Sequence, residues 1–233
     1  TLDRVKTMPP TAISDLVTVV GSAYFQPIAD LIENLTRSPA PAIYAAGTSN
    51  RENGYAASIS VLLVAVLESY TTRLRFVRKA EFDVGSTNTP ELLEKYFPDI
   101  PNKKELVEVF LLRNLLLHNH IWHLDVSDVE SQGAPTLATP IELGFKTNKH
   151  YEDVVDIGRR KTKTLELNVS PTSVDRSDAQ KVFTIVWNTL SFMGAKNFSH
   201  TPLANRMVRY QGKNRLFEEL IEELDRAKPL AAA

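Results

Sequence analysis

Apolar residues recur at steps of three and four along most of the chain, which is the spacing of amphipathic helices. This pattern predicts helices over about residues 13–35, 52–79, 102–123, 177–197 and 214–227. The helices at 52–79 and 102–123 are apolar on nearly every bearing, so we expect other elements to enclose them. Pro27 falls inside the first helix and is expected to kink or split it.

Helix start signals support these boundaries. Thr89-Pro90-Glu91 predicts a short additional helix, with Thr89 as the N-cap and proline at the first helical position. Asn102 with Glu105, and Ser177 with Gln180, have the spacing of capping boxes.

The chain changes character between about residues 125 and 171, where glycine and proline interrupt any helical period. Two short runs, PIELGF and KTLELNV, alternate polar and apolar residues and predict a small β-ribbon. The expected architecture is a mainly α single domain over residues 1–233, a bundle of about five or six helices. A small β or irregular insertion or cap occupies about residues 125–171.

Composition is that of a soluble globular protein, with 43% apolar and 24% charged residues. The absence of cysteine excludes disulfides and thiolate chemistry and fits a reducing compartment, so we expect a cytoplasmic location. The net charge of −1 means that any nucleic-acid contact must depend on a local patch. No membrane span is expected, because the longest strongly apolar run, Ile59–Leu67, is much shorter than the ~20 residues required.

The helix at 102–123 ends in LLRNLLLHNHIWHL, where polar residues interrupt a strongly apolar run. Each buried amide or imidazole without a partner costs roughly 1–3 kcal/mol, and an unpaired arginine costs more. On an ideal helix of 100° per residue the polar groups form two adjoining stripes, Arg113/His120/His123 and Asn114/His118. Arg113 and His118 are themselves about 140° apart, so they converge only if the helix deforms or a second chain completes the site.

Two structural interpretations of these residues remain open. Arg113 pairs with a buried carboxylate such as Glu68 while the histidines are satisfied locally, or His118, His120 and His123 donate imidazoles to a metal. Only Asp125 lies near enough in the sequence to support such a metal site. We therefore assign no metal ligand and no cofactor.

The segment Arg113-Asn114-Leu-Leu-Leu-His118 resembles the R-N-x-x-x-H form of the R-x(4–6)-H motif of HEPN domains. It lies near the end of a long apolar helix and follows another that contains LESY, residues 67–70, as is common in that family. The resemblance covers roughly residues 52–125, and the 125–171 segment is not explained by it.

The resemblance implies a compact helical bundle that dimerises so that two motifs face each other, and that cleaves RNA without a metal. The ribose 2′-OH is then the nucleophile, and the products are a 2′,3′-cyclic phosphate and a 5′-hydroxyl. His118 acts as general acid or base, Arg113 stabilises charge on the phosphorus, and Asn114 orients the histidine or a phosphate oxygen. His120 also fits the family spacing, so the choice between His118 and His120 stays open.

Two further sets of residues are candidates around this motif. Glu68 either positions Arg113 or faces solvent at a helix edge. The basic run at residues 158–163 either binds the RNA backbone through Arg159, Arg160 and Lys161 or is a solvated loop.

The resemblance leaves two functions open. The first is a homodimeric HEPN-type endoribonuclease, a toxin or phage-defence effector with an antitoxin or other partner protein. The second is a non-catalytic HEPN-like module that binds a nucleotide or a protein.

Overall fold

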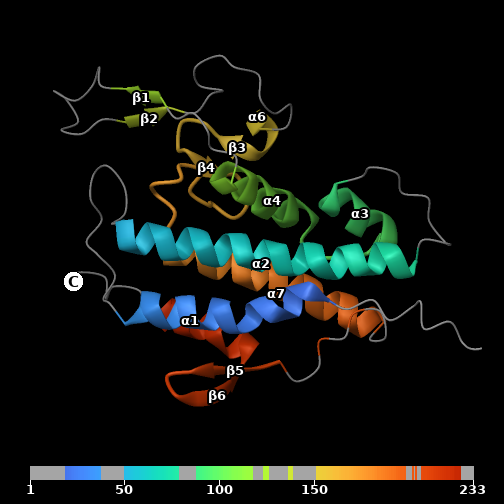
Figure 1. Cartoon of the computed structure of the whole chain (residues 1–233). Coiled ribbons are helices and arrows are strands. Elements are labelled where there is room, and N and C mark those ends of the chain that lie inside the picture. Colours follow the sequence, from blue (N-terminus) through green and yellow to red (C-terminus); the bar gives the residue numbers. More distant parts are fainter. Residues whose placement is uncertain are drawn as a thin grey trace, which may run out of the picture.

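The computed structural model describes residues 19–37, 50–78, 88–117, 123–125, 136–138, 151–197, 201, 203 and 206–226. These residues are mainly helical, and their strands form small two-stranded antiparallel sheets, so the prediction of a mainly α protein is confirmed. The longest helix, α2 (Asn50–Val77), runs the length of the molecule beside α7 (Arg176–Lys196) (Figure 1).

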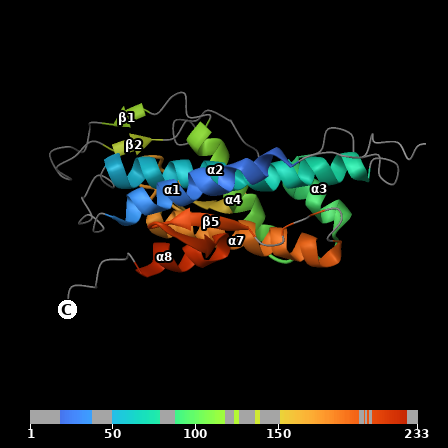
Figure 2. The ribbon, with the colours of Figure 1, turned by 60° about the horizontal axis from the view of Figure 1, so that its bottom comes forward.

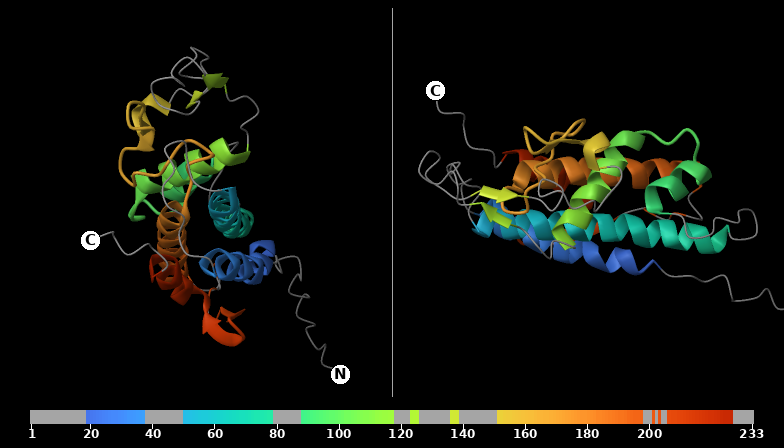
Figure 3. Two further views of the ribbon diagram at one scale, coloured as in Figure 1. Left: turned by 90° about the vertical axis from the view of Figure 1, so that its left-hand side faces the viewer. Right: turned by 90° about the horizontal axis from the view of Figure 1, so that it is seen from above.

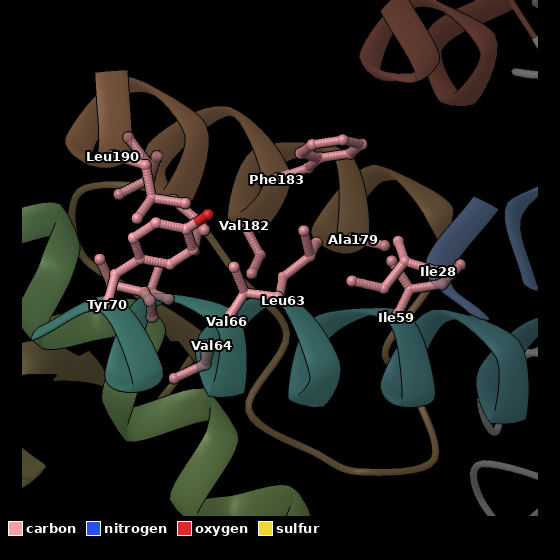
Figure 4. Packing of buried hydrophobic residues seen from close by; sticks show 14 of the residues in the cluster. Ile28, Ile59, Leu63, Val64, Val66, Tyr70, Ala179, Val182, Phe183 and Leu190 are labelled. Atoms are coloured by element: carbon pink, nitrogen blue, oxygen red, sulfur yellow. The ribbon is translucent and has the colours of Figure 1, made fainter. Parts of the chain in front are cut away.

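Helix α2 is the centre of the bundle, which explains why the middle of its sequence is apolar on nearly every side. It packs against α7, against α1 (Phe25–Thr36) and against α4 (Lys103–Leu117). Seen along the helices, α2 and α7 lie side by side, with α4 on one side of this pair and α1 on the other (Figure 3). Leu63, Val66 and Tyr70 of α2 face α7, whereas Val64 points away from it (Figure 4). All four side chains are buried.

The length and composition of α2 would also suffice to cross a membrane, alone among the described helices. Half of its most apolar stretch is buried inside the protein. A core helix of a bundle has the same composition, so this feature by itself does not indicate a membrane span.

The N-terminal helix is split as its proline predicts. A 3₁₀ helix, η2 (Val20–Tyr24), precedes α1, so that Pro27 lies in the first turn of α1, where an intrahelical N–H is not needed. Residues 13–18 of the predicted helix lie outside the described part. Gly21 lets η2 approach α2 closely: a Cβ there would lie 2.7 Å from the Cβ of Ser69.

Two predicted caps are wrong by one or two residues. Helix α3 (Thr89–Tyr96) is capped by Asn88, whose side chain accepts the N–H of Glu91. Helix α7 begins with a capping box formed by Asp175 and Asp178, not by Ser177 and Gln180. Asn102, before α4, has φ = 60°, a left-handed conformation and not the extended one of a capping box.

The prediction of a single helix over about residues 214–227 is wrong. Residues 214–216 belong to a hairpin of β5 (Met207–Tyr210) and β6 (Lys213–Leu216), which lies beneath α1 in Figure 1 and is seen from below in Figure 2. Gln211 and Gly212 close it with φ of 49° and 75°, the conformation of a type I′ turn. The chain then continues through η3 (Phe217–Glu219) into α8 (Leu220–Arg226), whose apolar face is buried as expected.

The region expected to form a cap contains two small hairpins. β1 (His123–Asp125) pairs with β2 (Thr136–Ala138), and after α6 (Tyr151–Val154), β3 (Val155–Asp156) pairs with β4 (Lys161–Thr162). The predicted ribbon between PIELGF and KTLELNV cannot be placed as such, because residues 140–145 lie outside the described part.

Three buried carboxylates attach the 155–176 segment to the helices. Glu108 of α4 accepts the backbone N–H groups of Thr164 and Leu165, both at 2.7 Å. Glu52 of α2 pairs with Arg176 at the start of α7. Asp178 accepts the backbone and side-chain N–H groups of Asn168, at 3.1 and 2.8 Å. Backbone donors that would otherwise be buried without partners are thereby satisfied.

Asp178 is expected to make the protein less stable as the pH rises from about 4 to about 6. Burial, and next the charge of Asp175, raise the pKa of Asp178 from 3.8 to about 6. The unfolded chain ionises first, so the contribution is complete below pH 3.8 and is lost as the pH rises through about 6. Its size is on the order of 3 kcal/mol. Asp178→Asn, which does not titrate, should therefore destabilise the protein more at pH 4 than at pH 7 in urea unfolding. An equal loss at both pH values would contradict this.

Candidate functional site

The site is built where α4 crosses α2. Arg113, in the last turns of α4, forms an ion pair through Nη2 with Oε1 of Glu68 on α2. Its Nη1 donates to Oδ1 of Asn114 at 2.9 Å. The side chains of Arg113 and Glu68 are 17% and 34% exposed, so the pair lies at the edge of the core and is reached by solvent. Of the two alternatives for Glu68, the structure shows the pairing with Arg113, although Glu68 is partly exposed and not a buried carboxylate.

The guanidinium is held in one orientation by its surroundings. Its Cζ lies 5.6 Å from the centre of the Phe110 ring, one turn earlier on α4. Its Nε is buried and has no hydrogen-bond partner among the described residues. Burial lowers the pKa of Arg113, but arginine titrates too high to lose its proton under ordinary conditions. The site therefore presents a fixed positive charge beside the exposed amide of Asn114.

The histidines are placed differently from the prediction, or lie outside the described residues. Helix α4 ends at Leu117, and His123 belongs to strand β1, so the prediction of a helix reaching His123 is wrong. The prediction that Arg113, His120 and His123 form a stripe on one helix is therefore wrong for His123, which lies on a strand. His118 directly follows Leu117 in the sequence, and His118 and His120 both lie outside the described part.

The metal interpretation depends on side chains outside the described part. Among the described residues, no group of three or more histidine, aspartate or glutamate side chains is placed to hold a metal ion. The side chains of all five histidines of the chain lie outside the described part, so the metal interpretation stays untested.

The basic run at residues 158–163 lies apart from Arg113. Arg159 pairs with Glu166 at 2.6 Å, and the Lys163 ammonium donates to the backbone carbonyls of Glu152 and Asp153. Arg160 and Lys161 lie in the same hairpin, which packs against α4 through Leu111 and its neighbours. Leu111 and Arg113 are about 200° apart around an ideal helix, so the hairpin covers the opposite side of α4. The structure thus unites Arg113, Asn114 and Glu68 but not Arg159, Arg160 and Lys161.

Sequence reasoning missed the contact with Phe110 and the buried roles of Glu52 and Glu108. The contact between Phe110 and Arg113 could have been predicted, because an aromatic residue three positions before an arginine lies on the same face of a helix. For Glu52 and Glu108 the signal is a carboxylate within a strongly apolar helix, which requires a partner when buried.

Comparison of the chain with protein-family models, curated proteins and solved structures found no match. A functional assignment therefore depends on the chemistry of the residues themselves.

Proposed function

We propose that this protein is a HEPN-type, metal-independent endoribonuclease that works as a homodimer, in the role of a toxin or phage-defence effector. The observation that carries the proposal is the placement of Arg113. Arg113 is the charged residue within the apolar stretch 109–117 of α4, and Glu68 and Asn114 fix it at the edge of the core with part of its side chain open to solvent.

The chemistry needs few protein groups. RNA supplies its own nucleophile, the 2′-OH, which attacks the adjacent phosphorus and expels the 5′-oxygen, leaving a 2′,3′-cyclic phosphate. Arg113 stabilises the charge on the phosphoryl oxygens with its planar set of donors. His118 removes the 2′-OH proton or protonates the leaving oxygen, because imidazole titrates near neutral pH. Asn114 orients His118 or binds a phosphate oxygen.

Homodimerisation is supported by a face of α4 that carries exposed apolar side chains among the described residues. Val107 and Leu117 are 40% and 48% exposed, and with Asn114 they lie on the same side of the helix. A second copy packed on this face would cover apolar surface and bring the two Arg113 sites close together. The expected solution state of the full chain is a dimer in analytical ultracentrifugation.

Product analysis tests the proposed function. Purified wild-type protein should cleave RNA in the presence of EDTA and leave 2′,3′-cyclic phosphate and 5′-hydroxyl ends, detected by end-specific labelling. His118→Ala should reduce the cleavage rate by about 10²- to 10⁴-fold, the usual contribution of a general acid or base. His150→Ala serves as the matched control, and a loss in His120→Ala but not in His118→Ala would transfer the role to His120.

The absence of cleavage by wild-type protein would overturn the enzyme proposal. The alternative is a non-catalytic module that binds a nucleotide or a protein. It is favoured by one observation: both terminal nitrogens of Arg113 already have partners within the chain. Under that alternative, wild-type protein binds its ligand and dimerises, and substitution of Arg113 changes only these two properties.

A further inference from the structure

The last turns of α2 carry a basic and aromatic sequence, Arg73-Leu-Arg75-Phe76-Val-Arg78. Leu74 is buried and anchors this stretch to the core. Phe76 keeps 41% of its surface exposed, although a phenylalanine is usually buried. Arg73 and Arg75 are half-buried, and around an ideal helix they lie on opposite sides of Phe76.

This stretch adjoins the Arg113 site along the helix axis. Arg75 follows Glu68 by seven residues, which places it on the same face of α2, about 10 Å further along. Phe76 lies about 12 Å along from Glu68, one turn after the exposed Thr72. A strand bound at Arg113 therefore reaches both residues within a few nucleotides.

Arg78 has a different role. It donates to the backbone carbonyl of Tyr96, and its guanidinium stacks 5.2 Å from the centre of the Tyr96 ring. It fastens the end of α2 to α3 and is not assigned to ligand binding.

The sequence of this stretch is basic although the chain as a whole is slightly negative. Between residues 68 and 78 the acidic residue is Glu68, which is paired with Arg113, while three arginines follow it. A phosphate backbone is attracted to such a patch, and an exposed aromatic ring among cations is the usual platform for an unstacked base. Bases in a duplex are already stacked, so the chemistry favours a single strand.

The basic hairpin at residues 158–163 is the weaker candidate for the same ligand, because it covers the side of α4 opposite to Arg113.

We infer that Arg73, Arg75 and Phe76 form a subsite for single-stranded RNA, next to the Arg113 site. This inference rests on the proposed function, because it extends the same RNA path. The arginines bind phosphates, and Phe76 stacks on a base.

The test uses the full chain and a fluorescently labelled 2′-O-methyl RNA oligonucleotide, which lacks the nucleophile and is bound without being cut. Phe76→Leu, which keeps an apolar helix-forming residue, should weaken binding about tenfold in fluorescence anisotropy, with an unchanged salt dependence. Arg75→Gln should weaken binding and make the slope of log affinity against log salt less steep by about 0.7. Arg73→Gln should act in the same direction.

Matched controls lie on the β5–β6 hairpin, where Met207 and Arg209 are also exposed. Met207→Ala and Arg209→Gln should leave the affinity unchanged, and circular dichroism should show that every variant is folded. If wild-type protein cleaves RNA but the Phe76 and Arg75 variants bind like wild type, the subsite is refuted and the proposed function stands. If wild-type protein binds but never cleaves, and these variants bind weakly, the subsite stands and the enzyme proposal fails. If wild-type protein does not bind the oligonucleotide, the subsite is refuted.

Discussion

Arg113→Lys is expected to lower the rate of RNA cleavage by about 10²- to 10³-fold, the usual cost of losing one positioned donor to a transition-state oxyanion. Lysine keeps the positive charge and can still reach Glu68, so the fold and the attraction to RNA should largely persist. It lacks the planar fork that lets one nitrogen contact Glu68, another contact Asn114, and the remaining donors contact phosphate. The loss should therefore appear in kcat more than in KM.

Single-turnover cleavage of a labelled RNA measures this effect. The matched control is Arg215→Lys, because Arg215 also bridges carboxylates, those of Glu219 and Glu223, but lies on β6. Its cleavage rate should equal that of wild type. If Arg113→Lys raises KM with kcat unchanged, Arg113 merely binds RNA and the assigned role in the chemical step is wrong.

Glu68→Gln separates orientation of the guanidinium from its charge. The amide still accepts a hydrogen bond from Arg113, but it no longer competes electrostatically with phosphate. Glu68 already pairs with Arg113, so an approaching phosphate must share the guanidinium with this carboxylate.

The helices of this protein could be predicted from the sequence because their apolar spacing is strong and long. Helix α2 was expected at 52–79 and spans Asn50–Val77, and α7 differs from its prediction by about one residue at each end. Tertiary contacts decided what local patterns could not. Aspartate and serine suit an N-cap equally well, so the sequence could not choose between Asp175 and Ser177. Asp175 caps α7 in a capping box with Asp178, and Asp178 is also bound by the neighbouring Asn168.

The β5–β6 hairpin was missed for a different reason. Its turn residues, Gln211 and Gly212, lack the asparagine or aspartate that usually marks such a turn. Tertiary bonds compensate: the side-chain amide of Gln26 on α1 bonds both the N–H and the carbonyl of Arg209. The helix predicted from the apolar spacing therefore began too early, at about residue 214, within what is strand β6.

The candidate site was predictable as far as Arg113, Glu68 and Asn114. An arginine within a buried helix needs a carboxylate on a facing helix, and Glu68 was the available one. The end of α4 was not predictable, because apolar spacing continues through residues 118–124 while the chain enters β1 at His123. The choice between His118 and His120 stays a prediction.

Glu52→Ala is expected to cost about 3–5 kcal/mol of unfolding free energy, the largest effect on stability of any single substitution considered. Glu52 and Arg176 form an ion pair whose side chains are 5% and 4% exposed. Arg176 Nε and Nη2 donate to the carboxylate at 2.8 and 2.6 Å, and the backbone N–H of Arg176 donates at 3.0 Å. Removing the carboxylate leaves a buried guanidinium without its counter-charge where α2 meets the start of α7.

Urea unfolding of a double-mutant cycle tests this. Arg176→Met alone should also destabilise the protein, because it leaves the Glu52 carboxylate buried without the guanidinium. The double variant Glu52→Leu with Arg176→Met removes both charges and should be more stable than either single variant. It should remain below wild type, because the buried N–H of residue 176 then loses its acceptor, at a cost of about 1–3 kcal/mol. Arg37→Met, which breaks the exposed pair of Arg37 with Glu33, is the control and should cost at most about 1 kcal/mol. If Glu52→Ala costs no more than this control, the buried pair does not hold the two helices together.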